Sequence, residues 1–395
     1  MIAKAFRIIL PMPMLWLVFL THCDKPAEAD LVFIAAADWR YTATEEYHSP
    51  EYFLGALNAI AEVGKGSFMI SPGDVEPLSA SEELIAQVLG ADYPWYPVIG
   101  NHELESPDYL DYLRSVNAGG TTLPNIVRAG PPGSLETTYS FDWGACHFVV
   151  LNQYFDGESD TGTDGDVVPE LLDWLERDLS ENTKGLIFVF GHEPLIAIPD
   201  MHNGRLRHQG DSLDKYMKNW HRFHQLLLKH DVTVYICGHT HNTSVAKING
   251  LWQIDVGHAR GTEDLFPALL YSRLVEAVET GQRLGKREDE IIAEFFRPRM
   301  YGVKKTLYYS ELTNGISYKQ LADQPGLEAL MTFYSTIQQD PEVLDQYCQR
   351  YWDNWNLTRS TFVRMRIKRE QVTAEIYRNN ARGGPYTLTH TQIIN

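Results

Sequence analysis

The fold is decided by the stretch Tyr96-Pro97-Val98-Ile99-Gly100-Asn101-His102-Glu103. Apolar and aromatic residues lead to a glycine, and an amide, an imidazole and a carboxylate follow directly. This order is typical of a buried strand that ends in a tight turn and presents polar groups at its carboxyl end. Open α/β proteins bind their ligands at that end of the sheet. We therefore expect a functional site here.

Four other apolar segments end in the same way. They are Leu31 to Ala37 before Asp38, Ser67 to Ser71 before Pro72-Gly73-Asp74, Leu186 to Phe190 before Gly191-His192, and Val232 to Cys237 before Gly238-His239-Thr240-His241. Each segment delivers an oxygen or nitrogen ligand just after a predicted strand. Because such a series is hard to obtain by chance, the sequence predicts one site assembled from five strand ends.

The series Asp, Gly-Asp, Gly-Asn-His-Glu, Gly-His and Gly-His-Thr-His resembles the calcineurin-like metallophosphoesterase superfamily, from about Leu31 to Val256. The resemblance implies an α/β (α+β) fold, with a two-sheet β sandwich flanked by helices and two metal ions at the strand ends. It also implies residue roles. Asp74 bridges both metals, Asp38 and His241 hold the first, Asn101, His192 and His239 hold the second, and His102 acts on the substrate.

The residue types lead to the same chemistry. Carboxylate, amide and imidazole ligands without nearby thiols suit two divalent ions such as Mn, Fe or Zn. Two such ions can clamp the attacking and leaving oxygens of an in-line displacement, with a metal-activated water attacking phosphorus. His102 would then protonate the leaving alkoxide or stabilise the phosphoryl oxygens. A lone histidine is more often a core or surface residue, but these histidines occur together in a ligand pattern.

Arg40 departs from the family pattern. The first family motif usually has a His or Asp two residues after its Asp, whereas a guanidinium cannot bind a cation. Purple acid phosphatases also lack that His, but they have a Tyr three residues after the Gly-Asp aspartate, where this chain has Pro77. The first metal is therefore expected to have fewer protein ligands. We expect Arg40 to hold a phosphoryl oxygen, and the alternative is an ion pair with a nearby carboxylate.

The amino-terminal residues predict export. Lys4 and Arg7 precede an apolar stretch from Ile8 to Leu20, which is shorter than a membrane span of about 20 residues and fits a secretory signal. Leu20-Thr21-His22-Cys23 resembles a lipoprotein box, and Ala27-Glu28-Ala29 offers a cleavage site. Residues 1–29 are thus a signal peptide or lipoprotein leader, with lipidation of Cys23 left open and an uncleaved anchor as the alternative. We expect a periplasmic or extracellular protein.

The rest of the chain is divided by where the ligand pattern stops. We expect a catalytic domain at 30–262, a mainly helical insertion at 263–360 and a hairpin at 361–395 that returns to the catalytic domain. The predicted helices cover 51–63, 81–89, 107–116, 169–179 and 213–230. The predicted hairpins pair 138–142 with 146–152, 243–248 with 251–256 across Asn249-Gly250, and 361–367 with 372–378.

Charge and composition limit the function. The formal net charge of −18 disfavours a nuclease or other nucleic-acid binder, and four cysteines do not make a disulfide scaffold. We expect a metal-dependent phosphoric ester hydrolase with a small-molecule substrate. The protein would contact a membrane only through a lipid anchor at Cys23, if that residue is lipidated. The alternative is a phosphoesterase-like binding protein that has lost catalysis. The sequence leaves open monoester or diester, the metals, the physiological ester and the oligomeric state.

Overall fold

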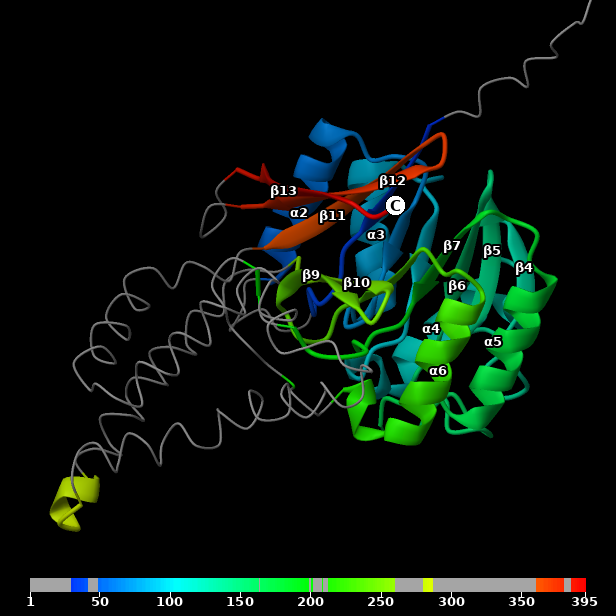
Figure 1. Ribbon diagram of the computed structural model, residues 1–395. Helices are drawn as coiled ribbons and strands as arrows, with labels where there is room; N and C mark the ends of the chain where they lie inside the picture. The colour runs from blue at the N-terminus through cyan, green and yellow to red at the C-terminus, as the bar shows by residue number, and fades with distance from the viewer. Residues whose placement is uncertain are drawn as a thin grey trace, which may run out of the picture.

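In the computed structural model (Figure 1), the described residues are 30–41, 49–162, 164–198, 200–201, 208, 212–259, 280–286, 360–379 and 385–395. The predicted leader, including Cys23, and nearly all of the predicted insertion at 263–360 lie outside them. Among the helices of the described part, none has the length and apolar composition needed to cross a membrane.

Two mixed β-sheets form the centre of the fold (Figure 1). The first has six strands, in which β1, β2 and β3 run parallel and β11 joins β1 in antiparallel pairing. Its strands, in sheet order, are β13 (Thr387–Ile393), β12 (Gln371–Arg378), β11 (Thr361–Lys368), β1 (Leu31–Ala35), β2 (Met69–Ser71) and β3 (Trp95–Pro97). The closing hairpin β11–β12 therefore extends the sheet that begins with the first described strand.

The second sheet has seven strands, and β6, β7, β8 and β10 run parallel in its middle. Its strands, in sheet order, are β4 (Ile126–Ala129), β5 (Tyr139–Trp143), β6 (Cys146–Val150), β7 (Leu186–Phe190), β8 (Val234–Cys237), β10 (Leu251–Val256) and β9 (Thr243–Ile248). Parallel strands end at the same edge of a sheet. The loops after β7 and β8 are therefore neighbours, as are those after β1, β2 and β3.

Aromatic side chains fill the space between the two sheets. Phe33 of the first sheet stacks on Phe68, with ring centroids 5.2 Å apart. It meets Phe148 and Phe188 of the second sheet edge to face, at 5.3 and 5.4 Å. Alternate residues of a strand point to opposite faces, and so the neighbouring Ile34 belongs to a different cluster on the outer face.

Helices cover both outer faces. Three pack on the first sheet through a cluster that includes Ile34 and Met69. Two pack on the second sheet through a cluster that includes Val149 and Val189. The first group is α2 (Ser49–Val63), α3 (Leu78–Leu89) and α4 (Pro107–Val116), and the second is α5 (Pro169–Glu181) and α6 (Met217–Lys229). The described chain thus forms the helix-flanked, two-sheet sandwich that was predicted.

Most predicted elements are confirmed within a few residues at their ends. The hairpin β9–β10 has the predicted bounds, and Asn249 and Gly250 both have positive φ, 45° and 93°. The single long helix predicted at 213–230 is wrong. A short 3-10 turn, η3 (Leu213–Lys215), precedes α6, because Tyr216 between them adopts φ −107° and ψ 65°, outside the helical region. Strands β4 and β13 were not predicted.

Candidate metal centre

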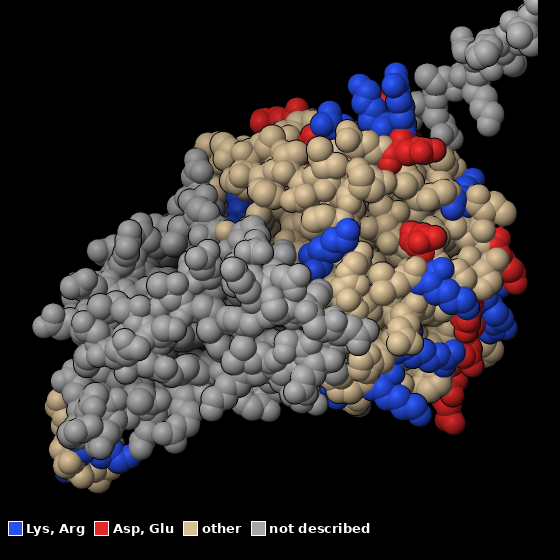
Figure 2. Space-filling model, in the orientation of Figure 1, with Lys and Arg blue, Asp and Glu red and all other residues tan. Residues whose placement is uncertain are grey.

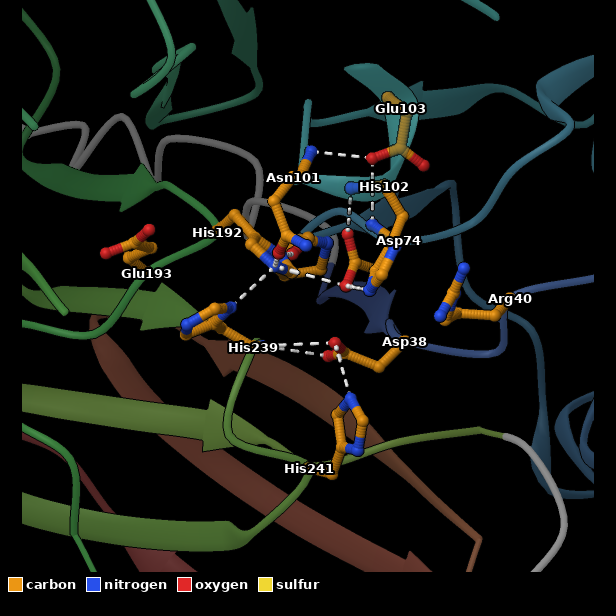
Figure 3. A network of polar contacts seen from close by, with 12 residues as sticks. Asp38, Arg40, Asp74, Asn101, His102, Glu103, His192, Glu193, His239 and His241 are labelled. Carbon is orange, nitrogen blue, oxygen red and sulfur yellow. Dashed lines mark hydrogen bonds and ion pairs between the residues drawn. The ribbon is translucent and has the colours of Figure 1, made fainter. Parts of the chain in front are cut away.

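Five loops meet at the carboxyl ends of β1, β2, β3, β7 and β8 and bring the predicted ligands together (Figure 3). Each candidate ligand lies only a few residues beyond the end of its strand, so the sheets determine the positions of their Cα atoms. Asp38 follows β1, Asp74 follows β2, Asn101 and His102 follow β3, His192 follows β7, and His239 and His241 follow β8.

Four ligand atoms predicted for the second metal converge on one point. The Nε2 nitrogen of His192 lies 3.2 Å from Asn101 Oδ1, 3.2 Å from His239 Nδ1 and 3.4 Å from Asp74 Oδ2. A tetrahedral ion with bonds of about 2.0–2.1 Å keeps its ligand atoms roughly 3.3 Å apart. The spacing of these atoms therefore fits a small divalent cation among them.

The tautomer of His192 supports this fit. Its Nδ1 lies 2.7 Å from the carbonyl oxygen of Pro72, which can only accept, so Nδ1 carries the hydrogen. In the neutral ring Nε2 then presents a lone pair, and this lone pair faces oxygen atoms of Asn101 and Asp74. Lone pairs at this distance repel one another unless a positive charge lies among them, and either a proton on Nε2 or a divalent metal ion supplies it. The residues present thus fit the metal that the sequence predicted.

Asp38, Asp74 and His241, predicted for the first metal, are also neighbours. Asp38 Oδ1 lies 3.6 Å from His241 Nε2. Asp38, Asp74 and His192 each offer a ligand atom, all within 4.8 Å of one another and all buried. The backbone N–H of His239 donates to the Asp38 carboxylate at 3.1 Å, which ties the β8 loop to the β1 loop.

The electrostatics of this pocket favour a cation. Burial lowers the pKa of His192, but the charges of Asp74 and Asp38 outweigh burial and raise that pKa to about 10. Burial raises the pKa of Asp74, but His192 and His102 outweigh it and hold this pKa well below its usual range. The same negative potential that stabilises a proton on His192 would stabilise a metal ion.

The loops adopt backbone conformations that only a well-braced site tolerates. Asp38, Asp74, His239 and His241 have φ between 55° and 70°, in the left-handed region that costs residues other than glycine about 1–3 kcal/mol. Gly100 cannot be replaced without movement, since a Cβ there would meet the Asp74 carboxylate and backbone. Local strain and close approach are therefore concentrated where the ligands converge.

Glu103 stabilises these loops through buried hydrogen bonds. Its buried carboxylate accepts hydrogen bonds from the backbone N–H groups of Asp74, Val75 and Gly100, at 2.9, 2.6 and 2.6 Å. It thereby joins the loop after β2 to the loop after β3. Burial and the nearby charge of Asp74 raise its pKa to about 8. We expected this carboxylate in a site but assigned it no role.

A family model described as calcineurin-like phosphoesterase matches residues 29–243. The chain belongs to this family. The match covers all five loops that carry the candidate ligands, strands β1 to β3 of the first sheet and β4 to β8 of the second, and it ends two residues after His241.

Relatives of this calcineurin-like phosphoesterase include acid phosphatases. Tartrate-resistant acid phosphatase type 5 of Rattus norvegicus is 24% identical over 264 residues, which cover 60% of this chain and 74% of the relative. Probable inactive purple acid phosphatase 9 of Arabidopsis thaliana is 27% identical over 185 residues, 40% of this chain and 26% of the relative. The solved structure of PhoD aligns with a TM-score of 0.48 and 12% identity, over 92% of this chain and 69% of that one.

Arg40 lies beyond Asp38 and Asp74, on the side of this phosphoesterase site away from His239 (Figure 3), and His102 is the first residue of η1 (His102–Leu104). Arg40 donates from Nε to Glu76 at 2.9 Å and from a terminal nitrogen to Glu105 at 3.2 Å. These pairs match the alternative expected from the sequence, a structural ion pair, and leave the phosphate contact a prediction. His102 Nε2 lies 3.7 Å from Asp74 Oδ2 and faces the predicted metals.

Sequence reasoning missed several residues that support the site. Asp255 of β10 is buried and accepts a hydrogen bond from the hydroxyl of Thr240, between the two histidines of the β8 loop. It also accepts from the backbone N–H of Gly257 at 3.1 Å. The hairpin containing Asp255 was predicted, but no local pattern shows that this carboxylate lies beside Thr240. Apart from these missed residues, the ring centroid of His208 lies 4.2 Å from that of His239, which places a further histidine beside the candidate ligands.

Proposed function

We propose that this chain is an exported hydrolase of phosphoric esters that depends on two divalent metal ions. Its membership of the calcineurin-like phosphoesterase family and its acid phosphatase relatives support hydrolysis of a phosphate ester. The convergence of Asn101, His192, His239 and Asp74 on one point supports metal dependence, and it is the observation that carries the proposal.

The residues divide into two groups by what they do. Asp74, Asn101, His192 and His239 would hold one ion, and Asp38 and His241, with Asp74 shared, would hold the other. When bound, the ions supply a nucleophile at neutral pH and neutralise charge on the phosphoryl oxygens.

We infer that His102 carries out the proton transfer. Its Nε2 faces the metal ligands, 3.7 Å from Asp74 Oδ2, and its side chain is 22% exposed, so an ester at the site can reach it. Its backbone N–H donates to Asp74 Oδ1 at 3.0 Å, which fixes its position relative to the ligand set. We assign it the proton that the leaving oxygen must receive when the ester bond breaks.

Hydrolysis of chromogenic esters tests this function. The protein is stripped of metal and titrated with Mn, Zn or Fe, and release of nitrophenol from a phosphomonoester and a phosphodiester is followed. Metal-restored turnover supports the proposal, and the ratio of the two rates tells which ester class the site prefers. No turnover with any of the metals on either ester would contradict it.

A binding protein without catalysis is the second candidate. Arg40 favours it, because a guanidinium paired to two carboxylates stands where the family usually has a further metal ligand. His102 speaks against it, since a protein that only binds an ester has no need of a proton donor. Phosphate binding without turnover, measured by calorimetry on the metal-loaded protein, would support this candidate.

Export and the partners are proposed from the sequence alone. We propose cleavage before Cys23 or after Ala29, and a small-molecule ester substrate. We expect a membrane contact only if Cys23 carries lipid. Figure 2 shows Lys and Arg side chains interspersed with Asp and Glu on the described part of one face, which gives that face no basic stripe for nucleic acid. Mass spectrometry of the mature amino terminus tests cleavage and lipidation together. An intact Met1 would contradict export by cleavage.

A further inference from the structure

A chain of four polar side chains leads from the protein interior to His102. Glu76 accepts from Arg40 Nε at 2.9 Å, and Arg40 donates to Glu105 at 3.2 Å. Glu105 in turn accepts from His102 Nδ1 at 2.5 Å. No member of this chain belongs to the predicted ligand set, and the sequence analysis assigned no role to Glu76 or Glu105.

The backbone brings Glu105 and His102 together. The N–H of Glu105 donates to the carbonyl of His102 at 3.2 Å, at the end of the 3-10 turn η1. Side chains three residues apart in a 3-10 turn lie one above the other. The carboxylate is therefore placed beside the imidazole by the turn itself.

The three acidic and imidazole groups could also be taken as a metal site. Glu76, His102 and Glu105 offer ligand atoms within 4.8 Å of one another. The guanidinium of Arg40 already lies against both carboxylates, however, and supplies the positive charge that they require. A divalent ion in the same place would be repelled by Arg40. These four residues therefore fit an ordered series of hydrogen-bonded side chains better than a third metal site.

The different solvent exposure of these side chains explains why Arg40 is needed to hold Glu105. The Glu76 side chain is fully buried, that of Arg40 is 21% exposed, and that of Glu105 is 53% exposed. An exposed carboxylate gains little from a single ion pair, because holding two long side chains in one geometry costs entropy. Arg40, anchored on buried Glu76, is planar and can hold Glu105 with less loss of freedom.

We propose that Glu105 is a positioning residue for His102 and that Arg40, anchored on Glu76, holds Glu105 in place. Glu105 accepts the hydrogen on Nδ1 of His102, which fixes the ring so that Nε2 faces Asp74 and the ester. The phosphate contact expected for Arg40 is then unnecessary. This inference rests on the proposed function, since it assigns the ordered ring of His102 to ester hydrolysis.

The first test observes the hydrogen bond directly, without turnover. Metal-free protein labelled with 15N-histidine should give a resonance for the proton on Nδ1 of His102 that is protected from exchange, and His102→Ala assigns it. Glu105→Ala should abolish this signal, Glu105→Gln should keep it because the amide oxygen still accepts, and Arg40→Ala should speed its exchange. A signal unchanged in Glu105→Ala, or absent from the wild type, would overturn the proposal.

The second test separates positioning from substrate binding. Glu105→Ala should lower kcat by about 10- to 100-fold with KM, metal content and Tm unchanged, and Glu105→Gln should recover most of the loss. In a His102→Ala background, Glu105→Ala should have no further effect, because both changes remove the same function. Glu83→Ala, at an exposed position on α3, is the matched control.

Two results of this second test would contradict the proposal. Losses that multiply in the double variant would mean that Glu105 does not act through His102. A raised KM with unchanged kcat in Arg40→Ala and Glu105→Ala would mean that the pair binds substrate. Either result leaves the wild-type turnover intact, whereas failure of the proposed function would leave metal-loaded wild type inactive, so the two failures are distinguishable.

Discussion

His192 Nδ1 lies 2.7 Å from the carbonyl oxygen of Pro72, although 120 residues separate the two in the chain. Because Pro72 begins the loop that carries Asp74, this hydrogen bond orients a candidate ligand that follows a strand of one sheet by the backbone of a loop from the other. A backbone carbonyl that holds the second ring nitrogen of a metal-binding histidine fixes both the tautomer and the ring direction. The spacing of the two sheets therefore helps to set the position of the His192 ring among the other candidate ligands.

Removal of His192 should remove metal. His192→Ala deletes one of four converging ligand atoms, and we expect metal affinity to fall by at least about 100-fold. Competition with a chelator followed by elemental analysis measures the effect. His390→Ala, on the edge strand β13, serves as control and should bind metal as the wild type does. Equal affinity in the two variants would remove His192 from the ligand set.

Glu103 should contribute to stability as well as to the site. Glu103→Gln replaces one acceptor oxygen with a donor, which leaves at least one buried backbone N–H without a partner at a cost of about 1–3 kcal/mol. We expect the free energy of unfolding in urea to fall by that amount in metal-free protein. Glu83→Gln on α3 should leave it unchanged. An unaltered unfolding midpoint in Glu103→Gln would show that its three hydrogen bonds are dispensable.

His102 should matter most for poor leaving groups. A proton donor assists a leaving oxygen in proportion to its basicity, so His102→Ala should lower kcat by about 10²- to 10⁴-fold on an alkyl phosphate and much less on a nitrophenyl phosphate. Rates on a series of esters with graded leaving groups measure this. The same fold-loss on every ester would assign His102 to phosphoryl binding instead.

The sequence was enough to predict that the candidate ligands converge, because each is attached to its own strand end. Asp38, Asp74 and His192 follow short apolar runs, and parallel strands must end at one edge. Their convergence therefore needed no information on side-chain packing. The hairpin turn at Asn249-Gly250 was predictable for the same reason, since its conformation is decided by two adjacent residues.

The supporting residues were not predictable, because each depends on a partner that is distant in sequence or on one local turn. Asp255 is unremarkable as a strand residue until β10 pairs beside β8 and places it at Thr240. The sequence allows Arg40 to face a phosphate or a carboxylate, and its ion pairs with Glu76 and Glu105 are seen only once the structure brings these residues together. The break at Tyr216 was missed because the apolar spacing continues across it.

His147 should make stability depend on pH away from the site. Its two ring nitrogens lie 2.8 Å from Asp178 and 2.8 Å from Asp142, so both bonds form only when the ring is protonated. Burial lowers the pKa of His147, but these carboxylates outweigh it and raise that pKa above the ordinary 6.5. Its contribution is therefore complete below that value and is lost as pH rises through the folded-state pKa.

The difference in unfolding free energy between wild type and His147→Gln measures this contribution. With chelator present to keep the metal site out of the comparison, the difference should shrink from about pH 6 to about pH 9. A difference that stays constant or grows over this range would show that His147 is neutral in the folded protein.

Truncation of Phe33, between the two sheets, should be costly. It contacts Phe68, Phe148 and Phe188 and is fully buried. Phe33→Ala should lower the free energy of unfolding by about 3–5 kcal/mol, and Phe33→Leu by much less, since most of the volume is kept. Thermal unfolding of metal-free protein compares the two. If Phe33→Ala and Phe33→Leu lowered the free energy of unfolding by similar amounts, the two sheets would have moved together to fill the cavity left by the alanine.

The central claim is that the converging side chains hold a pair of metal ions and that this pair makes the protein a hydrolase. Parallel titration of metal-free protein with Mn or Zn, following ions bound per chain and nitrophenol released from a chromogenic phosphate ester, tests it most directly. The account predicts that turnover rises with binding and reaches its plateau at two ions per chain. Stoichiometric binding without turnover on either a monoester or a diester, or turnover in the absence of bound metal, would contradict it.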